Sequence, residues 1–258
     1  HRAPRSRDER FEHGNLGVRV VRLATYNIHG WRGADGRRSV DRIADVIAEL
    51  DADVVALQEV DAPGHAEREG PLQKLAERVG MESVAGPTIV GPSRRYGNAL
   101  LTRLSVGAVR RIDISVLGRE PRGLLDVDLR TARGELRVLV THFGLRPFER
   151  GRQVETLCEA IRGRGDVPTA VMGDFNEWWP RGLTLSRLHD IMGYAPPTRS
   201  WPARCPILAL DRIWLRPSTA LKRVWALRSA GARGASDHLP VCADVDISAL
   251  HEPVGQPG

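Results

Sequence analysis

The stretch Ala170-Val171-Met172-Gly173-Asp174-Phe175-Asn176-Glu177 is the most informative part of the sequence, because an apolar run stops abruptly at a glycine and polar residues follow. The apolar residues before the glycine favour a buried strand. Alternation along that strand places Asp174 and Asn176 on one face and turns Phe175 to the other. Two polar side chains at the end of a buried strand are typical of an active site.

The rest of the chain alternates β-branched runs with amphipathic segments. Strands are predicted over residues 18–28, 53–60, 88–90, 99–102, 105–116, 123–130, 135–143, 169–174, 210–215, 221–227 and 241–247. Helices are predicted over residues 40–50, with Ser39 as N-cap, and over 71–79, 150–161 and 183–191. The second strand follows a helix and is predicted to run parallel to the first, whereas the strands between 83 and 143 are predicted to form one antiparallel sheet. One domain of layered sheets with helices outside is the simplest arrangement.

The length and composition agree with a single domain over residues 18–250, flanked by a polar N-terminal tail (1–17) and a C-terminal tail (251–258). No apolar run approaches the roughly 20 residues that a bilayer span requires. We therefore expect a soluble body with a cytoplasmic or membrane-peripheral location. The chain starts at histidine, so a removed leader remains open.

The net charge of +6 predicts an anionic partner such as nucleic acid, a phospholipid headgroup or a phosphate ester. Only Lys74 and Lys222 among the 38 basic residues are lysines, and the arginines are spread along the whole length. A general arginine bias explains this equally well. The three cysteines lie far apart, in none of the paired spacings that hold zinc.

Polar residues recur at the predicted strand ends. They are Asn27, Glu59, His142, Asp174 with Asn176, Asp211, and Asp237 with His238. Each one alone is more often part of a turn than of a catalytic site, but their joint occurrence favours a catalytic site.

These residues lie in seven motifs that occur in a fixed order between about residue 21 and about residue 247. The motifs are Thr25-Tyr26-Asn27-Ile28, Leu57-Gln58-Glu59-Val60, Gly97-Asn98-Ala99-Leu100-Leu101, Thr141-His142, Gly173-Asp174-Phe175-Asn176, Leu210-Asp211-Arg212-Ile213 and Ser236-Asp237-His238-Leu239-Pro240. In this order they resemble the endonuclease/exonuclease/phosphatase (DNase I-like) superfamily. The resemblance implies an α/β fold, namely a four-layer α/β sandwich of two packed mixed β-sheets flanked by helices. It also implies a divalent metal at the rim, usually Mg²⁺, for which Mn²⁺ can substitute.

The resemblance implies that Glu59 is the principal metal ligand, with Asn27 beside it. Asp237 supports the metal or its loop. A carboxylate suits Mg²⁺, a hard cation that prefers oxygen ligands.

The remaining polar strand ends suit the hydrolysis of a phosphate ester. Asp174 is expected to orient or deprotonate the attacking water, and Asn176 to donate to a phosphate oxygen. Asp211 and His238 resemble the family's aspartate–histidine pair. A charged His238 would stabilise the transition state and a neutral one would act as a base, and the sequence leaves both open.

His142 stands where DNase-like and sphingomyelinase-like members carry histidine and abasic endonucleases carry tyrosine. This favours a histidine that stabilises the phosphate or protonates the leaving group. Asn98, Arg122 and Trp178 are candidate substrate-binding residues, the last as an indole that stacks on a base or lies at a membrane interface.

The substrate is the least determined part of the prediction. The sequence resembles a bacterial subgroup often encoded beside cardiolipin synthase, which favours a phospholipid or a small phosphodiester. A DNA endonuclease or exonuclease is the alternative enzyme, and a non-catalytic binding module is the alternative from another class. We expect a monomer without an obligate protein partner.

Overall fold

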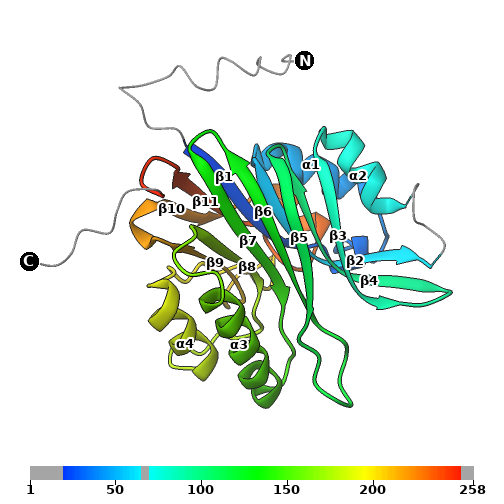
Figure 1. Cartoon of the computed structure of the whole chain (residues 1–258). Coiled ribbons are helices and arrows are strands. Elements are labelled where there is room, and N and C mark those ends of the chain that lie inside the picture. The colour runs from blue at the N-terminus through cyan, green and yellow to red at the C-terminus, as the bar shows by residue number, and fades with distance from the viewer. Residues whose placement is uncertain (1–19, 65–69, 251–258) are drawn as a thin grey trace, which may run out of the picture.

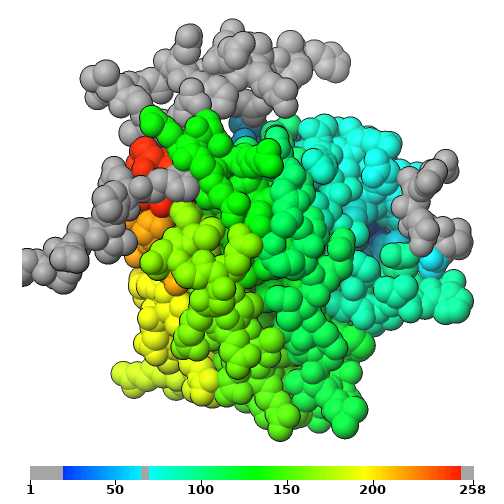
Figure 2. Space-filling model, in the orientation of Figure 1, coloured from blue at the N-terminus to red at the C-terminus, as the bar shows by residue number. Residues whose placement is uncertain are grey.

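The computed structural model describes residues 20–64 and 70–250, so the predicted tails at 1–17 and 251–258 lie outside the described residues. Two mixed β-sheets pack face to face, and helices cover their outer faces (Figure 1). In the space-filling view the green and yellow second half packs directly against the cyan first half (Figure 2). The four layers confirm the predicted α/β sandwich.

The first sheet has six strands in the order β10-β11-β1-β2-β4-β3. Their bounds are β1 Val20–Asn27, β2 Val54–Pro63, β3 Glu82–Val90, β4 Arg94–Thr102, β10 Leu221–Ala226 and β11 Val241–Asp246. β1 and β2 are parallel, as predicted, and the other neighbours are antiparallel. The apolar run at the start of β2 is buried on both faces, which explains why it lacks polar alternation.

The second sheet has five strands in the order β5-β6-β7-β8-β9. Their bounds are β5 Ser105–Asp113, β6 Gly123–Thr131, β7 Gly134–His142, β8 Thr169–Asp174 and β9 Asp211–Arg216. Only β7 and β8 are parallel neighbours here. Each sheet therefore contains one parallel pair, and both pairs run toward the same end of the sandwich. β2 continues to Pro63, past its predicted end at Val60.

The prediction of one antiparallel sheet between residues 83 and 143 is wrong. β3 and β4 complete the first sheet, and β5 opens the second. The chain changes sheets after Thr102, whose Oγ1 accepts a hydrogen bond from the Leu104 backbone N–H at 2.9 Å. Strand spacing does not report this change, because a strand after a short turn has the same sequence pattern in either sheet.

The helices divide between the two outer faces. α1 Val40–Leu50, α2 Pro71–Val79 and α5 Ala230–Ala235 cover the first sheet, and α3 Pro147–Arg162 and α4 Leu183–Met192 cover the second. Short 3₁₀ turns occur at η2 His29–Trp31 and η3 Ser218–Ala220. Ser39 caps α1 as predicted, whereas α5 has an Ala/Gly sequence without apolar periodicity and was not predicted. No helix of the described part combines the length and the apolar character needed to span a membrane.

Candidate active site

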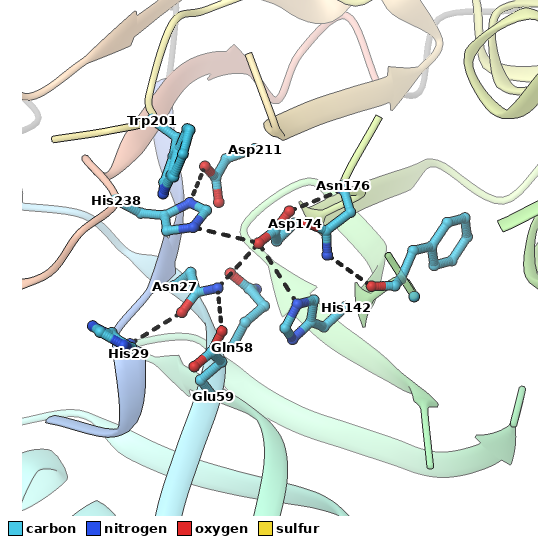
Figure 3. A network of polar contacts seen from close by, with 12 residues as sticks. Asn27, His29, Gln58, Glu59, His142, Asp174, Asn176, Trp201, Asp211 and His238 are labelled. Carbon is cyan, nitrogen blue, oxygen red and sulfur yellow. Dashed lines mark hydrogen bonds and ion pairs between the residues drawn. The ribbon is translucent and has the colours of Figure 1, made fainter. Parts of the chain in front are cut away.

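All of the predicted strand-end residues except Asp237 are seen together at one end of the sandwich (Figure 3). The parallel strands β1 and β2 bring Asn27 and Glu59 to this end, and β7 and β8 finish at His142 and Asp174. Asp211 begins β9, which runs antiparallel to β8, and therefore lies opposite Asp174. The topology thus collects residues that are up to about two hundred positions apart.

A β-bulge in β2 directs Glu59 toward this end. Two residues, Gln58 and Glu59, oppose the single residue Asn98 of β4. Glu59 has a φ of 58°, an uncommon conformation for a residue other than glycine. The extra residue interrupts the alternation of faces, so Gln58 stays buried and bonds Thr25 while its neighbour reaches the site.

Gly173 permits the close pairing of β7 and β8 next to Asp174. A Cβ atom at this position would collide with the backbone carbonyl of Thr141. The glycine that ends the apolar run is therefore a packing requirement of the strand that carries Asp174.

We expect Gly173→Ala to destabilise the protein by at least about 2 kcal/mol, because backbone atoms cannot make room for the methyl group without separating the strands. Urea unfolding monitored by circular dichroism measures this change. Gly163→Ala is the matched control, since its Cβ would lie 3.4 Å from its nearest neighbour, and Gly163 has a helical φ of −62°. Equal midpoints for the two variants would contradict the steric argument.

Asp174 is the centre of the polar network. Its Oδ2 accepts a hydrogen bond from Asn27 Nδ2 at 3.0 Å and lies 3.6 Å from His142 Nε2 and 3.7 Å from His238 Nε2. Its Oδ1 accepts from the backbone N–H of Asn176 at 2.9 Å. Contacts on both oxygens hold this buried carboxylate in one orientation.

Asn27 links Asp174 to Glu59. Its Nδ2 also donates to Glu59 Oε1 at 2.9 Å, while its Oδ1 accepts from the His29 backbone N–H at 3.0 Å. Burial raises the pKa of the Glu59 carboxyl, and the amide of Asn27 offsets this only in part. A nearby cation would favour the ionised form of this glutamate.

The oxygen atoms around Asn27 fit a hard divalent cation. The carboxylates of Glu59 and Asp174 both accept a hydrogen bond from Asn27 Nδ2, so they lie close together. Carboxylate oxygens are ligands that Mg²⁺ prefers. A second group, Asp174, Asp211 and His238, also has possible ligand atoms within 4.8 Å of one another. In this second group His238 Nδ1 and Asp211 Oδ2 already bond each other at 2.8 Å.

His238 is held in its charged form. Its Nδ1 donates to Asp211 Oδ2 at 2.8 Å, and Ser200 Oγ donates to the same oxygen at 2.5 Å. Burial alone would lower the pKa of His238, but the charges of Asp211 and Asp174 outweigh it and raise the pKa to about 10. Of the two states that the sequence left open, the imidazolium is therefore the one present at neutral pH.

His142 is held in the opposite state. Arg122 Nη1, which can only donate, lies 3.3 Å from His142 Nδ1, so Nδ1 accepts and the ring proton is on Nε2. Burial and then the charge of Arg122 lower the pKa of His142 to about 3. A neutral N–H that points toward Asp174 suits stabilisation of a phosphate oxygen better than protonation of a leaving group.

The low pKa of His142 predicts a loss of stability in mild acid. Below the unfolded pKa of about 6.5, the unfolded chain binds a proton that the folded chain takes up only near pH 3. Between pH 7 and pH 5 this linkage removes about 2 kcal/mol of unfolding free energy. Chemical denaturation at both pH values measures this change. Between pH 7 and pH 5 the unfolding free energy should fall by about 2 kcal/mol less in His142→Gln than in the wild type. An unchanged pH dependence would contradict the neutral assignment.

The other predicted residues lie around this network. Asn176 has a φ of 49° and donates one amide hydrogen to the Phe143 carbonyl at 2.8 Å, which leaves the second for a ligand. Asn98 is buried and donates to the Gly123 carbonyl at 3.0 Å, so it joins β4 of one sheet to β6 of the other. Its role in substrate binding stays a prediction.

Asp237 and Trp178 lie at the periphery. Asp237 Oδ1 lies 3.4 Å from His29 Nδ1, and Asp237 Oδ2 accepts a hydrogen bond from Trp201 Nε1 at 3.4 Å. Trp178 is 52% exposed in the loop after β8 and stacks edge-on against Trp179. The predicted metal role of Asp237 and the predicted substrate role of Trp178 stay predictions.

Phe175 points away from the site, as the strand alternation predicted. Its ring packs between Phe143 and Trp214, with centroids 5.1 and 4.8 Å away. This aromatic anchor fixes the backbone between Asp174 and Asn176, so that both polar residues remain at the rim.

Two supporting serines were missed in the sequence. Ser200 holds Asp211, and Ser236 Oγ donates to the Asn27 carbonyl at 2.7 Å while accepting from the His238 backbone N–H at 3.3 Å. Ser236 therefore connects the β1 end to the loop that carries His238. Ser236 lies in the quoted motif that carries His238, but its bond to Asn27, 209 residues away, has no local sequence signal.

Comparison with known proteins identifies the family of this chain. A model of the Endonuclease/Exonuclease/phosphatase family matches residues 24–238, which include all of the strand-end residues. The chain belongs to this family. The protein YbhP of Escherichia coli K12, itself uncharacterized, is 30% identical over 245 residues, which cover 88% of this chain and 96% of that protein.

Solved structures of the family share the fold. An endonuclease/exonuclease/phosphatase from Beutenbergia cavernae superposes with a TM-score of 0.70 at 24% identity, over 88% of this chain and 72% of that one. The human Nocturnin catalytic domain with bound sulfate gives 0.68 at 20% identity, over 87% and 93%. Truncated Caenorhabditis elegans TDP2 gives 0.64 at 19% identity, over 88% and 97%. At these identities the likeness establishes the architecture alone.

Proposed function

We propose that this protein is a Mg²⁺-dependent phosphodiesterase that hydrolyses a lipid-linked or small phosphodiester by water attack, with Mn²⁺ able to replace Mg²⁺. The family comprises hydrolases of phosphate esters. The observation that carries the proposal is the pair of histidines on either side of Asp174, with His238 Nε2 3.7 Å and His142 Nε2 3.6 Å from its Oδ2.

In this proposal Asp174 orients the attacking water and accepts its proton. A Mg²⁺ held by Glu59, with Asn27 beside it, would supply charge neutralisation on the phosphoryl oxygens. Glu59 and Asp174 are linked through one amide, so the metal side and the water side of the site are positioned together.

The donors are arranged for the charge that develops on the phosphate. The imidazolium of His238 and the Nε2–H of His142 both point toward Asp174, where the reacting phosphate would bind. The second amide hydrogen of Asn176 adds a neutral donor. Asp211 keeps His238 protonated, so it acts through that histidine and not on the substrate directly.

We also propose that the protein acts as a monomer. Its proposed partner is the phosphate-ester substrate alone.

A hydrolysis panel tests the proposal. Plasmid DNA, an abasic oligonucleotide, bis-p-nitrophenyl phosphate, phospholipids and inositol phosphates are incubated with Mg²⁺, Mn²⁺ or EDTA. We expect metal-dependent cleavage of the artificial diester and of a phospholipid. Cleavage of plasmid alone would identify a DNase-like nuclease instead, and no cleavage together with no metal binding would identify a binding module.

Glu59→Gln tests the metal site separately from turnover. We expect Mg²⁺ affinity, measured by isothermal titration calorimetry, to fall at least about tenfold because the charged oxygen ligand is lost. Glu135→Gln is the control, since Glu135 is exposed near the start of β7 and pairs with Arg164. Unchanged affinity in Glu59→Gln would place the cation elsewhere.

A further inference from the structure

Six large apolar side chains are exposed around the start of α3, and we call them the rim patch. They are Leu117, Leu145, Phe148, Trp178, Trp179 and Leu183, each more than half exposed. Single exposed apolar residues are ordinary on protein surfaces. Six of them gathered from three separate loops and two helix starts indicate an interaction surface.

Contacts between the loops and helices bring members of the rim patch together. The guanidinium of Arg119 lies 5.1 Å from the ring centroid of Phe148, so the loop between β5 and β6 lies against the start of α3. Both segments are visible at the lower edge of Figure 1. Leu183, at the start of α4, reaches α3 as well, because a Cβ atom on Gly151 would lie 3.8 Å from its Cδ2.

A buried ion pair supports the rim patch from beneath. Arg150 Nη2 donates to Glu177 Oε2 at 3.0 Å, and its Nη1 donates to the Leu145 carbonyl at 2.6 Å. Glu177 Oε1 in turn accepts from the Trp179 backbone N–H at 3.1 Å. The two loops that carry the exposed indoles and Leu145 are therefore tied together, and their apolar side chains are more than half exposed.

The rim patch adjoins the active site. Two of its loops leave the sheet directly after His142 and Asp174, and Asn176 is bonded to the Phe143 carbonyl between them. Any surface that covers the patch therefore lies next to the site entrance.

The charges of this region have an excess of arginine. Its acidic side chains are paired: Glu120 with Arg122, Glu149 with Arg119, and Glu177 with Arg150. Arg146 and Arg181 are exposed beside Leu145 and Trp179, and neither has an acidic partner among the described residues. An apolar patch with unpaired arginines complements a surface that is apolar inside and anionic at its edge.

We propose that the rim patch docks the protein on a lipid bilayer that carries anionic headgroups. Tryptophan and phenylalanine favour the level of the headgroups, the leucines reach the acyl boundary, and arginine binds lipid phosphates. Nucleic acid fits less well, because a base can stack on an indole but not on a leucine. The inference deepens the proposed function and rests on it for the choice of substrate, since docking would present the site entrance to lipid headgroups.

Vesicle sedimentation tests the docking without turnover. Phosphatidylcholine vesicles with and without phosphatidylglycerol are mixed with the wild type or with Leu145→Glu/Phe148→Glu. The control is Val20→Glu, because Val20 begins β1 at the end of that strand away from Asn27 and the site. We expect binding to the anionic vesicles, and a partition coefficient at least about tenfold lower in the double variant alone. Arg146→Glu/Arg181→Glu should lose binding to anionic vesicles, whereas Arg133→Glu, in the distant β6–β7 turn, should not.

Fluorescence provides a readout that needs no destabilising variant. Brominated lipids should quench the tryptophan emission of the wild type, and Trp178→Phe/Trp179→Phe should lose most of that quenching. Equal vesicle binding by the wild type and both charge-altered double variants would overturn the proposal, as would binding of duplex DNA but not of vesicles. Asp174→Asn should bind vesicles like the wild type, so failure of docking and failure of the proposed chemistry are distinguishable.

Discussion

Replacing Asp174 by Asn should lower kcat at least about 100-fold while the protein remains folded, because an amide cannot accept the proton of the attacking water. The substitution preserves the size of a side chain that is almost fully buried. It also places a neutral group between the imidazolium of His238 and the N–H of His142, so both donors lose the carboxylate they face.

Steady-state rates with bis-p-nitrophenyl phosphate and saturating Mg²⁺ measure this loss, and circular dichroism checks the fold. Asp166→Asn is the matched control, at an exposed position in the turn after α3. A variant that keeps more than about a tenth of the wild-type rate would remove Asp174 from the role of general base.

Replacing His238 by Gln should lower kcat by about 100- to 1,000-fold, the usual effect of removing one donor to a developing oxyanion. The wild type requires the protonated ring, and the pKa of about 10 keeps it protonated at neutral pH. Activity that depends on His238 is therefore complete well below pH 10 and is lost as the pH rises through this value. Asp211→Asn removes the neighbouring charge that does most to raise this pKa, so its alkaline limb should lie at lower pH.

The pH dependence of kcat in the wild type, Asp211→Asn and His238→Gln distinguishes an acid from a base. We expect kcat of the wild type to fall as His238 loses its proton at alkaline pH, and kcat of Asp211→Asn to fall at a lower pH. His238→Gln should show no fall of this origin. A wild-type rate that increases as the pH rises toward 10 would show instead that the neutral form of His238 is the active one.

Much of the site was predictable because strand periodicity is a local property. The run from Ala170 to Gly173 ends a buried strand, and alternation alone turns Asp174 toward the site and Phe175 into the aromatic core. The resemblance carried by the ordered motifs implied the α/β sandwich, and the structure confirms its layers.

The sequence of each segment thus determined the strands, four of the five described α-helices and the capping of α1, whereas α5 lacks apolar periodicity and was not predicted. Only the tertiary structure decided the change of sheet after Thr102, the bulge that directs Glu59 to the site and the opposite charge states of His142 and His238. Periodicity depends on neighbours in the chain. A protonation state depends on burial and on charges such as those of Arg122 and Asp211, which only folding brings within a few ångströms of each imidazole.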